Sequence, residues 1–98
     1  MNINMCKSDI FQNLLRLTAE ETETSAERIT GNHTDMESTD ARYILVTLLY
    51  ERGFYPSQIA TLLNRKPRGI RYLLVRGLTS PMVGIMLAKI RQKAGNDS

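Results

Sequence analysis

The residues best suited to chemistry in this chain lie in the segment LLNRKPRGIRYLL, residues 62–74. A proline and a glycine interrupt its two leucine-rich runs, and four cationic side chains surround these breakers: Arg65, Lys66, Arg68 and Arg71. Guanidinium and ammonium groups bind phosphate oxygens, and arginine also forms paired hydrogen bonds with guanine. The segment therefore predicts the binding of a polyanion and no catalysis.

The charge of the chain is divided between its halves, although the net charge is only +3. Residues 1–50 contain four basic and eight acidic residues, whereas residues 51–98 contain nine basic and two acidic ones. No acid lies between Arg52 and Lys93. This asymmetry indicates a polyanionic partner. The alternative is a mixed surface on which the two halves meet in the fold.

The elements that position these residues are predicted to be helices, because apolar residues recur at intervals of three and four. We expect an all-α fold of five to six short helices in a single domain over residues 1–98. The predicted helices cover residues 8–22, 24–30, 38–52, 56–63, 67–76 and 80–94. Thr24 is the expected cap of the second helix, and Ser38, Thr39 or Asp40 that of the third. Between them GNHTDMES, residues 31–38, is predicted to be a surface loop.

The fourth and fifth predicted helices are short and separated by about three residues, which is typical of a helix-turn-helix. On the fifth helix the leucine and isoleucine residues share one side, and Arg68, Tyr72 and Val75 lie opposite. We therefore predict that Arg68 and Tyr72 contact base edges in the DNA major groove. Phosphates of the DNA backbone would be held by Arg65, Lys66, Arg71 and Arg76. A solvated basic helical hairpin would give a similar pattern.

Three segments, in this order along the chain, carry a resemblance to a known family: LTAEETETSAERITG, STDARYILVTLLYERG and YPSQIATLLNRKPRGIRYLL. Together, residues 10–76 resemble the C-terminal DNA-binding domain of the bacterial chromosomal replication initiator DnaA. The resemblance implies a Trp-repressor-like helical fold with its helix-turn-helix at residues 56–76, and it places Arg65 at the arginine of the family's signature. The helix over residues 80–94 lies outside it.

The chain departs from this family at two places. The loop over residues 31–38 contains no arginine, whereas the family's loop is basic and reaches into the minor groove. Lys66, Pro67, Arg68 and Gly69 stand where the signature has an acid, a histidine and threonines. We therefore expect no recognition of the initiator's own DNA site, and a role as a small bacterial regulator of transcription or DNA replication. The chain also lacks a GxxxxGK[ST] phosphate loop, which excludes an ATP-driven initiator.

No cofactor, metal ion or small-molecule substrate is predicted. His33 is the only histidine, and a metal site needs three or four convergent ligands. The acidic run EETE, residues 20–23, is interpreted as a solvated helix end and not as paired catalytic carboxylates. Cys6 is the only cysteine, so an internal disulfide is excluded.

The predicted partner is double-stranded DNA, and the predicted location is the cytoplasm. No apolar run reaches the roughly 18 residues of a membrane helix, and the N-terminus has no secretory apolar core. Apolar residues of the last helix favour either core packing or a homodimer contact: Met82, Ile85, Met86, Leu87 and Ile90.

Two other partners are compatible with the sequence. One is a protein, in which case the chain is a protein-interaction module that keeps the fold without binding DNA. Acidic residues close to the fifth helix would favour this alternative, because they repel the phosphates of DNA. RNA is the other, but residues 62–74 lack the interleaved aromatic residues that stack unpaired bases.

Overall fold

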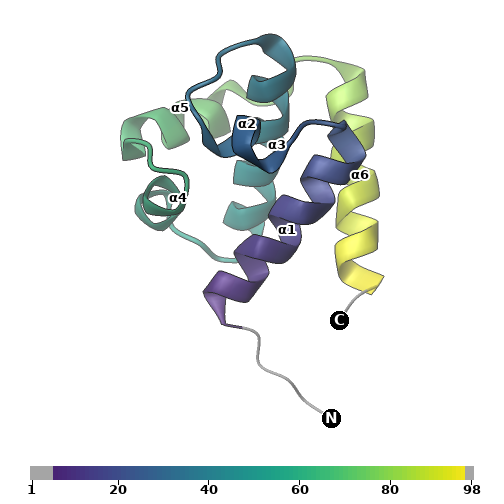
Figure 1. Cartoon of the computed structure of the whole chain (residues 1–98), viewed down its shortest axis with the longest axis horizontal. Helices are drawn as coiled ribbons and strands as arrows, with labels where there is room; N and C mark the ends of the chain where they lie inside the picture. Colours follow the sequence, from purple (N-terminus) through teal and green to yellow (C-terminus); the bar gives the residue numbers. More distant parts are fainter. Residues whose placement is uncertain (1–5, 97–98) are drawn as a thin grey trace.

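Helices and the turns between them make up residues 6–96, the part of the chain that this computed structural model describes (Figure 1). The helices are α1 (Lys7–Thr22), α2 (Ala26–Thr30), α3 (Met36–Glu51), α4 (Pro56–Leu62), α5 (Pro67–Arg76) and α6 (Pro81–Asn96). No strand occurs within these residues. The predicted all-α class is therefore confirmed, whereas the helix-turn-helix stays a prediction.

Proline and glycine set most of the boundaries in the second half of the chain. Pro56, Pro67 and Pro81 each occupy the first position of a helix, where the missing N–H has no intrahelical partner to lose. Gly77 follows α5 with a φ of +74°, a conformation that glycine adopts without strain. These boundaries are the ones that the sequence predicted.

The predicted caps of α2 and α3 were wrong. α2 is capped by Ser25, whose Oγ accepts a hydrogen bond from the backbone N–H of Arg28 at 3.2 Å, whereas the Thr24 hydroxyl donates to the carbonyl of Thr22. α3 begins at Met36, because the Asp35 carboxylate accepts from the backbone N–H of Ser38 at 3.1 Å. The loop before α3 is consequently three residues shorter than predicted.

Helix α3 is the centre of the molecule and packs against each of the other five helices. Its apolar stripe is buried, and so are Arg42, Tyr43 and Val46 on its other sides. The stripe consists of Ala41, Ile44, Leu45, Leu48 and Leu49. All six helices contribute to a single apolar cluster. α6 lies along α1 and α3 (Figure 1) and buries Val83, Leu87, Ile90 and Ala94. Core packing is thus confirmed for Leu87 and Ile90, whereas Met82 and Ile85 are exposed.

Candidate nucleic-acid interface

Helix α5 is held by one side only and presents the other to solvent. It packs against α3 and α4 and buries Ile70 and Leu73. The opposite side is exposed: 65% for Tyr72 and 86% for Val75. Arg68 and Arg71 are exposed on the same helix, as is Lys66 directly before it. The structure therefore brings together four of the six predicted site residues on one accessible surface, here called the α5 basic face: Lys66, Arg68, Arg71 and Tyr72.

Two carboxylates, Glu21 and Glu51, pair with the cations of α6. Glu21 on α1 binds Lys93 at 2.9 Å and Lys89 at 3.9 Å. Glu51 at the end of α3 forms an ion pair with Arg91. The hydrogen bond from Lys93 accordingly lowers the pKa of Glu21, and the hydrogen bond to Glu51 raises the pKa of Arg91.

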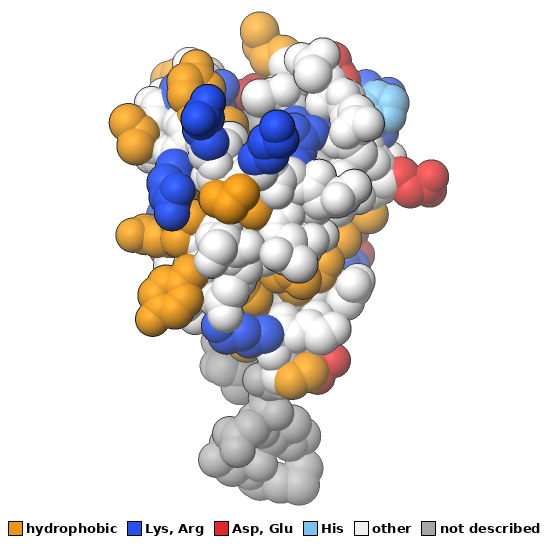
Figure 2. Space-filling model, turned by 90° about the vertical axis from the view of Figure 1, so that its left-hand side faces the viewer, with side chains coloured by type: hydrophobic (Ala, Val, Ile, Leu, Met, Phe, Trp, Pro, Cys, Tyr) orange, Lys and Arg blue, Asp and Glu red, His pale blue; other side chains and the backbone are white. Residues whose placement is uncertain are grey.

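The α5 basic face keeps its charge. Within residues 6–96, no ion pair involves a cation between Arg65 and Arg76. Figure 2 shows Lys and Arg side chains gathered on this side of the molecule, with Asp and Glu side chains at its margins. Asp40 is one acid near the C-terminal end of α5, since it lines a hollow together with Arg76 and accepts a hydrogen bond from Thr79.

The other two predicted site residues, Arg65 and Arg76, turn toward the fold. Arg65 donates from Nη2 to the carbonyl of Gly31 at 2.6 Å. The Arg76 guanidinium lies 5.7 Å from the centre of the Tyr43 ring, and its Nε and Nη2 are buried. Both guanidinium groups are engaged within the molecule, so any contact with DNA phosphates falls mainly to the exposed residues.

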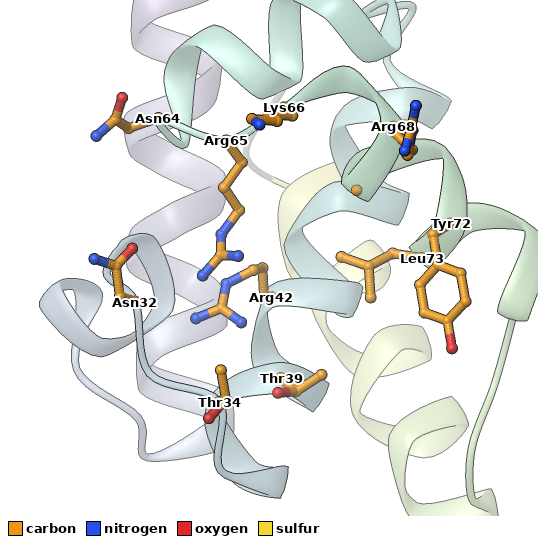
Figure 3. Close-up of a pocket in the computed structure, with 11 residues that line it drawn as sticks. Asn32, Thr34, Thr39, Arg42, Asn64, Arg65, Lys66, Arg68, Tyr72 and Leu73 are labelled. Atoms are coloured by element: carbon orange, nitrogen blue, oxygen red, sulfur yellow. The ribbon is translucent and has the colours of Figure 1, made fainter.

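A cleft of about 520 Å³ lies beside the α5 basic face (Figure 3). It is bounded by the loop before α3, the first two turns of α3, the turn that joins α4 to α5, and α5 itself. Its lining includes four cationic residues, Arg42, Arg65, Lys66 and Arg68, together with asparagine and threonine side chains. No acidic residue of the described chain lines it. The cleft is therefore strongly electropositive.

Arg42 lines this cleft but was not among the site residues predicted from the sequence. Only 3% of it is exposed, and its guanidinium donates to two carbonyls of α2 and two of the loop after it. Nε donates to Ile29 at 2.8 Å, and Nη2 donates to Arg28, Gly31 and His33. Burial, together with the nearby charge of Arg65, lowers its pKa to about 10. The one signal in the sequence is its place inside the otherwise apolar run of residues 41–46.

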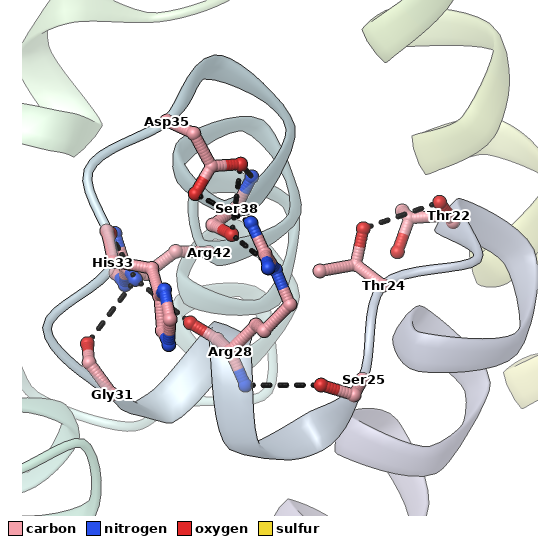
Figure 4. A network of polar contacts seen from close by, with 9 residues as sticks. All are labelled: Thr22, Thr24, Ser25, Arg28, Gly31, His33, Asp35, Ser38 and Arg42. Atoms are coloured by element: carbon pink, nitrogen blue, oxygen red, sulfur yellow. Dashed lines mark hydrogen bonds and ion pairs between the residues drawn. The ribbon is translucent and has the colours of Figure 1, made fainter.

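Asp35 and Arg28 fix the other side of this loop (Figure 4). Arg28 forms an ion pair with Asp35 at 2.8 Å and donates from Nε to the Ser38 hydroxyl. The hydrogen bond from the backbone N–H of Ser38, aided by the side chains of Ser38 and Arg28, lowers the pKa of Asp35 to about 2. Asp35, one of the two acids of the predicted loop, is thus committed to local structure.

Comparison of this chain with protein-family models, curated proteins and solved structures found no match. The resemblance to the initiator's DNA-binding domain therefore stays a prediction. Among the residues that the structure describes, no three His, Cys, Asp or Glu side chains are grouped so as to hold a metal ion. No single helix there is long and apolar enough to cross a membrane, although α5 and Pro81–Gly95, bent by 108°, meet that test jointly.

Proposed function

We propose that this protein binds double-stranded DNA through the α5 basic face, without catalysis. The observation that supports this best is that Lys66, Arg68 and Arg71 are exposed and form no ion pair with a described residue, while each cation of α6 pairs with a carboxylate. An α-helix with its side chains is about 10–12 Å across, and the major groove of B-DNA is roughly 12 Å wide. α5 can therefore enter the groove with its exposed side leading.

The four exposed residues have different roles in the proposed complex, because their side chains differ in chemistry. Arg68, near the N-terminus of α5, is placed to form paired hydrogen bonds with guanine, and Tyr72, one turn later, to contact a thymine methyl or a phosphate. Lys66 and Arg71 on the flanks would hold phosphates, which position the protein on the duplex. The positive end of the α5 dipole adds to this attraction.

A role as a small cytoplasmic regulator of bacterial transcription or replication fits a stand-alone DNA-binding domain. One recognition helix contacts few base pairs, and such proteins commonly dimerise to read two half-sites about 34 Å apart. Leu78, Met82 and Ile85 are exposed around the start of α6. We place the contact of a homodimer there.

The test is fluorescence anisotropy with a labelled mixed-sequence duplex over a range of salt concentrations. We expect Arg68→Ala/Arg71→Ala to lower affinity about tenfold or more at low salt. It should also reduce the slope of log K against log salt by roughly 1–2, because about 0.9 counterions are released for each phosphate contact. The matched control is Arg16→Ala/Arg91→Ala, which removes the same charge from α1 and α6.

Equal losses in the two double variants would show that net charge alone drives binding, and would overturn the assignment to α5. If the unmodified protein binds no duplex at low salt, the α5 basic face is not a DNA surface.

A protein-interaction module is the second candidate, favoured by apolar exposure next to the basic residues. Tyr50 is 53% exposed and lines a shallow hollow with Arg71, Leu74 and Val75. Such a mixture of aromatic, aliphatic and arginine side chains is common at protein interfaces. Absence of DNA binding, together with saturable binding of an acidic protein partner that Val75→Asp abolishes, would establish this function.

A further inference from the structure

We propose that the electropositive cleft between the loop before α3 and the turn after α4 is a binding site for a phosphate group. Arg42 and Arg65 form its cationic floor, and Lys66 stands at its edge. The inference goes beyond the α5 basic face, because Arg42 and Arg65 are not part of that face, although Lys66, Arg68 and Tyr72 line the cleft as well. The ligand chemistry is a phosphate ester, either free or in the backbone of DNA.

The first support is the meeting of two guanidinium groups from distant parts of the chain. Arg42 and Arg65 donate to the same backbone oxygen, the carbonyl of Gly31, at 3.3 and 2.6 Å. Figure 3 shows the Arg65 side chain extending toward Arg42. Two like charges this close and partly desolvated repel each other. The charge of Arg65 is one cause of the lowered pKa of Arg42. A bound anion would reverse this repulsion.

The second support is a pair of donors that the fold leaves unused. The hydrogen bonds of Arg42 to described residues leave from Nε and Nη2. Its Nη1 makes none of these bonds, is not among the side-chain nitrogens fully shielded from solvent, and belongs to a residue that lines the cleft. Nε of Arg65 is buried and without an acceptor in the described part of the chain. Buried arginine donors are normally satisfied. These two nitrogens are therefore available to an anion in the cleft.

The third support is the match between the lining and a phosphate ester. Arginine binds phosphate through two parallel N–H groups, and lysine adds a compact charge. The cleft adds a threonine hydroxyl, from Thr39, and no carboxylate that would repel an anion. Its volume of about 520 Å³ lies in the range of small-ligand sites and exceeds what a phosphate ion fills. Tyr72 at the rim offers a ring on which an organic group can stack.

The experiment measures thermal unfolding in inorganic phosphate or pyrophosphate against sodium chloride of equal ionic strength. A ligand present at several times its dissociation constant raises the Tm of a domain of this size by roughly 4–8 °C. We expect a rise of this order for the unmodified protein, and its loss in Arg65→Gln. Arg52→Gln removes an exposed arginine that does not line the cleft, and it should retain the rise, including any general stabilisation by phosphate.

A rise that is equal in Arg65→Gln and Arg52→Gln would overturn the proposal. Because Arg65→Gln also loses a hydrogen bond to Gly31, a titration of the unmodified protein followed by arginine Nε–Hε NMR signals gives an independent answer. The signals of Arg42 and Arg65 should shift most on addition of pyrophosphate, and unchanged signals would overturn the site. Neither readout contains DNA, so failure here is distinct from failure of the Arg68→Ala/Arg71→Ala test.

A competition experiment, in which pyrophosphate is added to the protein bound to a labelled duplex, identifies the source of the phosphate. If pyrophosphate displaces the duplex more than sodium chloride of equal ionic strength does, the cleft holds a phosphate of the DNA backbone. If the duplex and pyrophosphate bind independently, the cleft takes a free phosphate ester. Either result is compatible with a phosphate site, and the two differ in what supplies the group.

Discussion

At the scale of single residues, Arg42 closes the loop between α2 and α3. Its guanidinium donates to four carbonyl oxygens, two in the last turn of α2 and two in the loop that follows. In Arg42→Met the side chain keeps much of its volume but donates nothing, so buried carbonyls lose their partners. We expect the free energy of unfolding, measured by urea denaturation, to fall by about 3 kcal/mol.

The control for Arg42→Met is the same substitution at an exposed arginine. Arg16 forms an exposed pair with Glu20 one turn along α1, and such pairs contribute little because water screens them. Arg16→Met should therefore lower the free energy of unfolding by no more than about 0.5 kcal/mol. Similar losses in the two variants would show that Arg42 is not a structural clamp.

Because Asp35 caps α3, we expect the stability of the protein to decrease when this carboxylate is protonated at acidic pH. Its pKa is lowered from 3.8 to about 2, first by the hydrogen bond from the backbone N–H of Ser38. A carboxyl whose pKa is lowered by folding stabilises the protein above its ordinary pKa, and this contribution disappears as the pH falls through the folded value. Asp35→Asn should therefore be less stable than the unmodified protein at neutral pH, and the difference should shrink between about pH 4 and pH 2.

The measurement for Asp35 is urea denaturation at a series of pH values. Glu37→Gln removes a neighbouring exposed carboxylate and leaves the cap in place, which makes it the matched control. A difference between Asp35→Asn and the unmodified protein that stays constant down to pH 2 would contradict the role of this carboxylate.

At the scale of elements, Gly69 in α5 and Gly77 directly after it should respond in opposite directions to substitution by alanine. Gly69 lies in the first turn, and a Cβ added there meets no atom within 4 Å. Gly69→Ala should raise the free energy of unfolding by about 0.5–1 kcal/mol, because alanine loses less backbone entropy on folding. Gly77 ends the helix with a φ of +74°, so Gly77→Ala should lower it by about 1 kcal/mol or more. Urea denaturation distinguishes the two, and a loss of stability in Gly69→Ala would contradict the structure.

A helix boundary could be predicted from the sequence where residues close to it along the chain determine it. Pro56, Pro67 and Gly77 act within one turn of their own position, and the boundaries of α4 and α5 were predicted from them. The start of α3 was missed because Ser38, Thr39 and Asp40 are all acceptable caps. The choice of Asp35 depends on Arg28, which reaches it from α2, and local patterns contain no such information.

The candidate site also contains residues whose directions the sequence predicted and residues whose directions it could not predict. The 100° rotation per residue of a helix placed Arg68 and Tyr72 outward from sequence alone. The direction of Arg65 is set by Gly31, which is 34 residues away, and that of Arg76 by the ring of Tyr43. These contacts depend on how α5 packs onto α3, so the cleft formed by Arg42 and Arg65 could not be predicted from periodicity.

At the scale of the whole molecule, the division of charge along the sequence becomes a division between helices. Among the described residues, ion pairs join the acidic first half to the basic second half only at α6, where Glu21 binds Lys89 and Lys93. Glu51 pairs with Arg91 of the same helix. The mixed-surface interpretation therefore holds for α6 and fails for α5. The excess positive charge is concentrated on one face, which raises the local potential that a polyanion encounters.

The same packing makes α6 an integral part of the core and not an appendage to residues 10–76. Ile90 is completely buried, whereas Ile85 on the same helix is 52% exposed. Truncation of a buried isoleucine removes apolar contacts and leaves a cavity, so Ile90→Ala should lower the free energy of unfolding by about 2–4 kcal/mol. Ile85→Ala, the same substitution on the exposed side, should change it by less than about 1 kcal/mol. The measurement is urea denaturation with a single cooperative transition, and equal effects at the two positions would mean that α6 is not docked as the structure shows.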